Sequence, residues 1–125
     1  MDSRLERALA ASRHGVLSTI RVEGSVHSVL INPYLFRSSV GIFSQAASVK
    51  VGNLSWIPLA TLCLFSESSY LTVEGEVELS REPALIDEAA LAFELKYGRP
   101  PRPTLGARLL ILLHPIRVYG ALGGT

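Results

Sequence analysis

The sequence predicts a mainly β protein, a small β-barrel of six or seven short antiparallel strands with two or three helices added to it. Short β-branched and apolar runs recur along the chain, separated by Gly, Ser and Pro residues. Only two or three segments show helical spacing instead. A chain of 125 residues, 48% apolar and 18% charged, supplies one core and is too short for two ordinary domains. We therefore expect a single domain over residues 1–125.

Charge and hydropathy narrow the class of partner. Twelve Lys and Arg against eleven Asp and Glu leave a net charge of +1, which disfavours nucleic acid as a partner. No run reaches the roughly 18 apolar residues of a membrane-spanning helix, so we expect no membrane association and a cytoplasmic protein. The single cysteine, Cys63, lies in an apolar run and suits a buried thiol in a reducing compartment. A mean hydropathy of +0.31 is high for a small monomer, so we expect a homodimer.

The N-terminal part is predicted to begin with a helix and continue as strands. Residues 3–6 (SRLE) have the form of a capping box, and the apolar residues that follow share one helical face until about Gly15. Runs at 16–22, 26–31 and 40–44 have the composition of strands. The short polar segments between them predict antiparallel pairing through tight loops.

The middle of the chain is predicted to hold a short helix and two strands. The helix lies near residues 49–57 and is stopped by Pro58. Residues 60–65 are almost wholly apolar, and residues 70–79 alternate between an apolar face and a face rich in glutamate. Those glutamates are most simply a solvated strand face. Gly75 interrupts the apolar face, which indicates a β-bulge or a barrel corner.

The C-terminal part is predicted to contain the longest helix and the closing strands. Apolar residues at helical spacing cover residues 83–97, and a glycine follows. Three prolines in 99–103 fix an extended connector. Residues 109–113 and 116–122 are expected to close the sheet, and 123–125 to form a frayed end.

Lys50 stands out as the only charged side chain between residues 38 and 66, and as one of only two lysines in the chain. A lone ammonium in apolar surroundings either reaches solvent or meets an anion. Ser44, Gln45 and Ser48 precede it and supply hydroxyl and amide groups where a strand turns into a helix with free N–H groups. The spacing leaves two interpretations open, a phosphate-binding site or a solvated lysine beside ordinary turn and cap residues.

Other side chains give weaker signals. The three histidines are far apart and lack the spacing of metal ligands, so no metal site is expected. No Gly-x-Ser-x-Gly motif is present, which leaves a hydrolase unsupported. For Tyr34, Phe36 and Trp56 we favour packing over stacking on a ligand ring.

The segment IFSQAASVKVGNL at residues 42–54, followed by Pro58 and an apolar strand, resembles the hallmark of a known family. This is the pyridoxamine 5'-phosphate oxidase-like family of FMN-binding split barrels, and in particular its coenzyme F420-dependent branch. Two weaker matches follow in the order in which the family has them along the chain. They are VEGEV at 73–77 and PIRV at 115–118. The resemblance spans roughly residues 5–120.

This resemblance implies a six- to seven-stranded antiparallel split β-barrel that dimerises and holds two cofactors in clefts at the dimer interface. It also implies that Ser44 and Lys50 hold the cofactor phosphate, with Gln45, Ser48 and Asn53 as nearby polar contacts. The cofactor, F420 or FMN, transfers hydride from its own ring, so no catalytic side chain is expected. The resemblance thus implies an oxidoreductase that acts on a small organic molecule.

Some features depart from the family pattern. The end of the chain lacks the substrate motif of the pyridoxamine phosphate oxidases proper, so that specific activity is not expected. F420 carries an acidic tail, and candidate arginines for it are Arg37, Arg99, Arg102 and Arg108. Two alternatives stay open, a non-catalytic cofactor-binding or scaffold protein and, less favoured, a haem-binding relative in which a histidine such as His114 reaches the iron.

Overall fold

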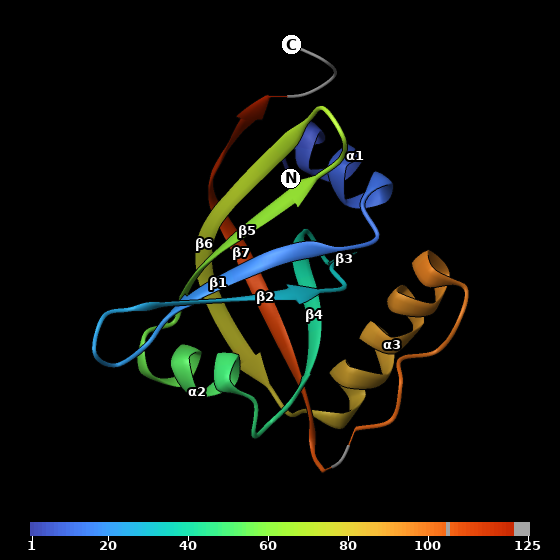
Figure 1. The fold of residues 1–125 in the computed structure, drawn as a ribbon. Helices are drawn as coiled ribbons and strands as arrows, with labels where there is room; N and C mark the ends of the chain where they lie inside the picture. Colours follow the sequence, from blue (N-terminus) through green and yellow to red (C-terminus); the bar gives the residue numbers. More distant parts are fainter. Residues whose placement is uncertain (105, 122–125) are drawn as a thin grey trace.

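A computed structural model describes residues 1–104 and 106–121, which form one curled antiparallel sheet with three helices (Figure 1). The helices are α1 (Ser3–Ala11), α2 (Val49–Trp56) and α3 (Pro83–Tyr97). The strands are β1 (Gly15–Ile20), β2 (Val26–Ile31), β3 (Tyr34–Phe36), β4 (Ser39–Gln45), β5 (Leu59–Phe65), β6 (Tyr70–Ser80) and β7 (Arg108–Ala121). The predicted mainly β fold is confirmed.

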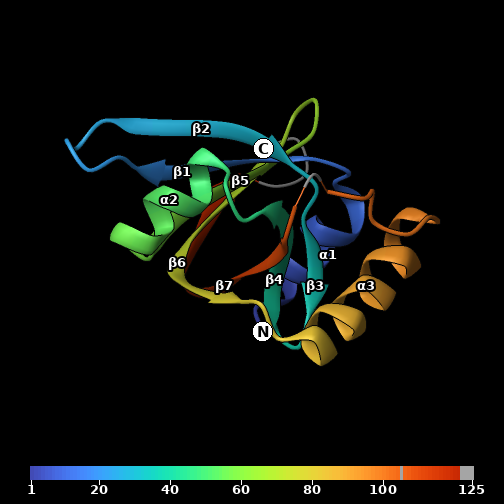
Figure 2. The same cartoon turned by 90° about the horizontal axis from the view of Figure 1, so that it is seen from below.

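The sheet order is β2-β1-β5-β6-β7-β4-β3, and every neighbouring pair is antiparallel. The edge strands β2 and β3 are not hydrogen-bonded to each other, so the curled sheet is a split barrel (Figure 2). The long strands β6 and β7 pair along most of their length and connect the two halves. Strand β7 also pairs with β4, so β4, which leads to α2, lies beside the strand that follows the C-terminal connector.

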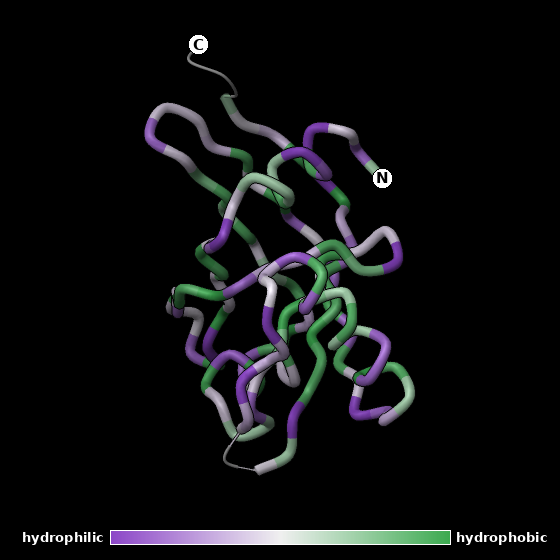
Figure 3. The backbone as a smooth tube through the Cα atoms, turned by 90° about the vertical axis from the view of Figure 1, so that its right-hand side faces the viewer, coloured by the Kyte–Doolittle hydropathy of each residue, from purple (hydrophilic) through white to green (hydrophobic). Residues whose placement is uncertain are grey.

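The main core lies inside the curl of the sheet. Apolar side chains of β1, β4, β5, β6 and β7 meet there, and α1 adds Leu5 and Leu9. Figure 3 shows hydrophobic and hydrophilic residues interspersed along the backbone. Each fully buried side chain of this size stabilises the fold by roughly 1.5–3 kcal/mol. This core holds the strand ends in fixed positions.

A second core joins α3 to the sheet. Phe93 and Tyr97 of α3 pack with Tyr34 and Phe36 of β3. The hydroxyl of Tyr97 donates a hydrogen bond to the carbonyl oxygen of Pro33 at 2.6 Å. Tyr34 and Phe36 therefore pack in the interior, as expected from the sequence, whereas Trp56 is 61% exposed.

The structure corrects two N-terminal expectations. Helix α1 already includes Ser3, and its N-cap is Asp2, whose carboxylate accepts from the backbone N–H of Arg4 at 2.8 Å. The predicted capping box therefore begins one residue too late. Strand β3 was not predicted, because three residues are too few to show alternation. A turn at Arg37 and Ser38, both with positive φ, connects it to β4.

The structure also joins the two predicted C-terminal strands into one. β7 continues through Pro115, where a register shift sets Glu74 opposite Arg117 and Gly75 opposite Pro115. The expected bulge at Gly75 is confirmed. A Cβ atom there would lie 2.2 Å from the carbonyl oxygen of His114, so the close approach of the strands requires glycine.

Helix α3 has the predicted bounds and ends at Gly98, with a left-handed φ of 73°. The connector 99–103 contains no helix or strand, as its prolines predict. Leu122, the predicted last strand residue, and the predicted frayed end at 123–125 lie outside the described residues. Within residues 1–104 and 106–121, no helix has both the length and the apolar character needed to cross a membrane.

Candidate functional site

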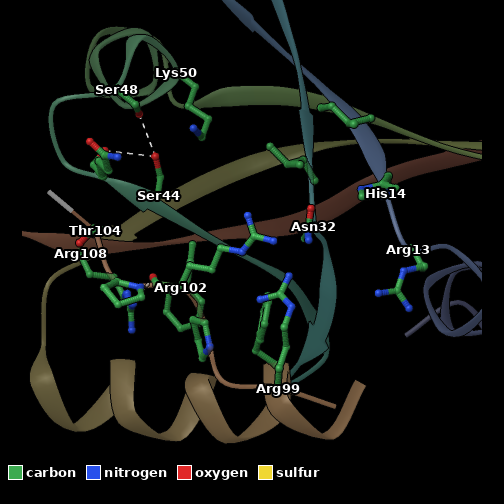
Figure 4. A pocket seen from close by; sticks show the side chains of 17 residues that line it. Arg13, His14, Asn32, Ser44, Ser48, Lys50, Arg99, Arg102, Thr104 and Arg108 are labelled. Carbon is green, nitrogen blue, oxygen red and sulfur yellow. Dashed lines mark hydrogen bonds between the residues drawn. The ribbon is translucent and has the colours of Figure 1, made fainter. Parts of the chain in front are cut away.

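An open cleft of about 820 Å³ lies where the end of β4, the start of α2 and the connector after α3 meet (Figure 4). Its volume falls within the roughly 300–1,000 Å³ usual for small-molecule sites. Four of the five site residues predicted from the sequence line it, namely Ser44, Gln45, Ser48 and Lys50. The structure thus brings together the residues of the proposed phosphate-binding segment.

Two serines face each other at the junction of β4 and α2. Ser48 is the N-cap of α2, and its Oγ accepts from the N–H of Val51 at 3.4 Å. The Oγ atoms of Ser44 and Ser48 lie 2.8 Å apart, and Ser44 is only 5% exposed. Gln45 ends the strand, and its carbonyl accepts from the N–H of Ser48. The junction therefore presents hydroxyl groups and a helix N-terminus to the cleft.

Lys50 lies in the first turn of α2, and Figure 4 shows its amine directed into the cleft. The side chain is half-buried, and this burial lowers the pKa of its ammonium group. Within residues 1–104 and 106–121, it has no carboxylate within ion-pair distance. An anionic ligand would supply the missing counter-charge, because it favours the charged form that desolvation penalises.

Arginines dominate the rest of the cleft. Arg13 precedes β1, Arg99 and Arg102 belong to the connector, and Arg108 begins β7. With Lys50, five of the twelve cationic residues of the chain line one cleft, and no Asp or Glu is among the lining residues. The cleft is therefore strongly positive, although the net charge of the whole chain is only +1.

Two of these arginines lie over the aromatic floor of the cleft. The guanidinium of Arg99 is 5.2 Å from the ring centroid of Phe93, and that of Arg108 is 5.3 Å from that of Phe43. The two rings are 6.2 Å apart and both line the cleft. Because stacked guanidinium groups keep several N–H donors free, the floor combines an apolar surface with hydrogen-bond donors.

Of the four arginines suggested from the sequence, three line the cleft and Arg37 does not. Its guanidinium pairs with the carboxylate of Glu88 in α3. Sequence reasoning missed Arg13, which belongs to the cleft because the turn before β1 faces the connector (Figure 4). In the sequence, only the position of Arg13 shortly before the first strand could have pointed to its place in the cleft.

Asn53, the fifth predicted site residue, does not line the cleft. It is buried on α2, and its amide donates to the hydroxyl of Thr19 in β1 at 3.0 Å. His114 also lies elsewhere, with Nδ1 2.6 Å from the Ser39 hydroxyl and Nε2 3.1 Å from the Glu78 carboxylate. Both of its ring nitrogens are therefore engaged.

The open seven-stranded barrel with a cation-lined cleft places the chain among the split-barrel proteins. A profile of the pyridoxamine 5'-phosphate oxidase family matches residues 1–121, so the chain belongs to that family. The family resemblance found in the sequence is thereby confirmed. No curated protein matches the chain in a sequence search.

Several solved structures share the fold. A conserved hypothetical protein from Mycobacterium tuberculosis has a TM-score of 0.85 and 18% identity, over 97% of this chain and 84% of that one. An F420 reductase has a TM-score of 0.76 and 20% identity, over 91% and 94% of the two chains. A heme binding protein from Mycobacterium smegmatis has a TM-score of 0.75 and 19% identity, over 98% and 55%. At these identities, the similarity establishes the fold alone.

Proposed function

We propose that the cleft binds a phosphorylated flavin-type cofactor, coenzyme F420 or FMN, and that the protein is an oxidoreductase acting on a small organic substrate. The observation that carries this proposal is the gathering of five cations, without a carboxylate, beside the paired hydroxyls of Ser44 and Ser48. Membership of the pyridoxamine 5'-phosphate oxidase family and the fold shared with an F420 reductase support the redox assignment.

Different residues of the cleft would bind different parts of the cofactor. Ser44, Ser48 and Lys50, with the N-terminus of α2, suit a phosphate group, because charged donors form the stronger hydrogen bonds. Gln45 adds an amide beside them. The bound cofactor supplies hydride transfer from its own ring, and the protein binds and orients it.

We favour F420 over FMN because of the charge beyond the phosphate-binding segment. Arg13, Arg99, Arg102 and Arg108 come from three separate parts of the chain and line the same cleft. A single phosphate leaves most of these cations without a partner, whereas the acidic tail of F420 offers further negative groups. Arg37 takes no part in this proposal, since Glu88 already pairs with it.

We further propose a cytoplasmic homodimer in which the partner subunit completes the cofactor site. Exposed apolar side chains of Val26, Leu59 and Ile116 surround a second hollow of about 450 Å³ on the outer face of the sheet. An apolar sheet face of this kind is typically covered by another protein surface. Replacing Ile116 by lysine should shift the dimer toward monomer in analytical ultracentrifugation, and an unchanged mass would contradict this interface.

The proposed function is tested by fluorescence titration of the protein with FMN and with F420. Removing a charged hydrogen-bond donor costs about 1.5–3 kcal/mol of binding free energy. Lys50→Ala should therefore weaken cofactor binding roughly tenfold or more. Lys96→Ala is the matched control, because Lys96 is the only other lysine and donates to Pro33 outside the cleft. The proposal is contradicted if the protein binds neither cofactor, or if wild type and Lys50→Ala bind the cofactor with equal affinity.

The second candidate is a non-catalytic protein that only holds the cofactor. It predicts tight cofactor binding without oxidation or reduction of any compound in a broad substrate panel. For haem, the engaged nitrogens of His114 leave no free ligand at that position. A Soret band after incubation with haem would reopen that possibility.

A further inference from the structure

Residues 99–104, which we call the strap, form one wall of the cleft. The strap contains no helix or strand, and its three prolines fix φ and remove three N–H donors. At its start, the guanidinium of Arg99 stacks over Phe93 on the cleft floor. The strap therefore depends on side-chain contacts, since backbone pairing does not hold it.

One hydrogen bond joins the strap to the sheet. Nη2 of Arg108 donates to the carbonyl oxygen of Arg102 at 2.6 Å. The other hydrogen bonds of strap residues are local, from Arg99 to Pro100 and from Thr104 to Gly106. Within residues 1–104 and 106–121, the Arg108 bond is thus the sole hydrogen bond that connects the strap to a strand.

Arg108 is itself firmly placed. It begins β7 opposite Gln45, and the neighbouring N–H of Ala46 donates to the carbonyl of Ala107 at 3.0 Å. Its guanidinium lies over the ring of Phe43. Its Nε is buried and has no acceptor among the described residues. The side chain thus contacts both the ring and the strap, while its buried Nε–H has no partner among the described residues.

We propose that Arg108 is a positioning residue that ties the strap to the sheet and so fixes Arg102 as an anion-binding group of the cleft. Arg102 is otherwise carried by a segment without backbone pairing. Holding its carbonyl determines where its Cα, and therefore its guanidinium, can lie. This inference deepens the proposed anion-binding function of the cleft and rests on it.

The first test is a double-mutant cycle read by calorimetric titration with inorganic pyrophosphate. In the wild-type protein, Arg102→Ala should weaken pyrophosphate binding about tenfold. In an Arg108→Ala background, the same change should weaken it less than threefold, because Arg102 is no longer held in place. Equal factors in both backgrounds, or no pyrophosphate binding to wild type, overturn the proposal.

The second test measures 15N backbone order parameters in the strap without ligand, because the N–H groups of Arg102 and Thr104 donate no hydrogen bond to the described residues whose loss amide exchange could report. The order parameters of these two residues should fall from about 0.85 in wild type to below about 0.6 in Arg108→Ala. Arg13→Ala removes another cleft arginine that does not contact the strap through a hydrogen bond, so it should leave the strap order parameters unchanged. Unchanged order parameters in Arg108→Ala contradict the positioning role.

Two measures keep the tests decisive. If Arg108→Ala does not fold, Arg108→Met replaces it, since its aliphatic stem still covers Phe43. If neither FMN nor F420 binds but the cycle and the order parameters behave as expected, the proposed cofactor fails and the strap inference stands. If a cofactor binds while the cycle is additive and the strap order parameters are unchanged, the strap inference alone fails.

Discussion

The ring of Tyr34 lies against Gly41, its cross-strand partner on β4. A Cβ atom on Gly41 would lie 2.5 Å from Cε2 of that ring. Tyr34 is fully buried and contacts Phe43 and Phe93, with ring centroids 5.6 and 5.7 Å away. Because those two rings form the floor of the cleft, the absence of a side chain at Gly41 helps to place that floor.

Gly41→Ala should therefore destabilise the protein. An added methyl group in a packed core costs typically about 1–3 kcal/mol, which urea unfolding would measure. Gly52→Ala is the matched control, since no atom lies within 4 Å of a Cβ there and the residue is inside α2. Alanine at that position should stabilise the protein by about 0.5–1 kcal/mol. A similar effect of both substitutions would contradict the packing described for Tyr34.

Asn53→Ala should reduce stability and leave cofactor affinity unchanged. Its amide donates to buried Thr19, and a lost buried hydrogen bond of this kind costs about 1–3 kcal/mol. Ser44→Ala should show the opposite pattern, a several-fold loss of affinity with a smaller change in the free energy of unfolding. Titration and thermal unfolding of both variants separate the two roles. Weakened cofactor binding in Asn53→Ala would instead make this residue a binding contact.

Arg99→Ala should weaken binding of an anionic cofactor about five- to tenfold, since a guanidinium with free donors leaves the cleft. Arg37→Ala removes the same charge but outside the cleft, where Glu88 pairs with it. Its affinity should stay within twofold of wild type, because exposed charges at a distance are screened by salt. Titrations of both variants at equal ionic strength make the comparison. Equal losses would show that only net charge matters.

Lys96 should make stability depend on pH between about 8 and 10. Burial, together with nearby Arg13, lowers the pKa of Lys96 to about 8 from the model-peptide value of 10.5. Above pH 8 the unfolded chain therefore binds more protons at this residue than the folded chain, and stability rises with pH. The free energy of unfolding of wild type relative to Lys96→Met should increase from pH 7 to pH 9.5. A constant or falling difference would contradict the lowered pKa.

Local patterns in the sequence predicted most of the elements of the fold. The period-2 alternation of residues 70–79 predicted β6, and the helical spacing of 83–97 predicted α3 with its bounds. Gly75, which interrupts the apolar face, predicted a bulge or a barrel corner, and the register shift between β6 and β7 lies there. Strand β3 was not predicted because three residues are too few to show alternation, and β7 was predicted as two strands that end and begin around Pro115.

The sequence by itself determined the segment that contributes Ser44, Gln45, Ser48 and Lys50, because these residues are close in the chain and differ from their apolar surroundings. Only the tertiary structure decided which distant cations join them. Pairing of β7 with β4 places Arg108 beside Gln45, and the connector after α3 adds Arg99. Local periodicity encodes which face of a strand is buried, whereas the choice of neighbouring strand depends on the packing of the whole core.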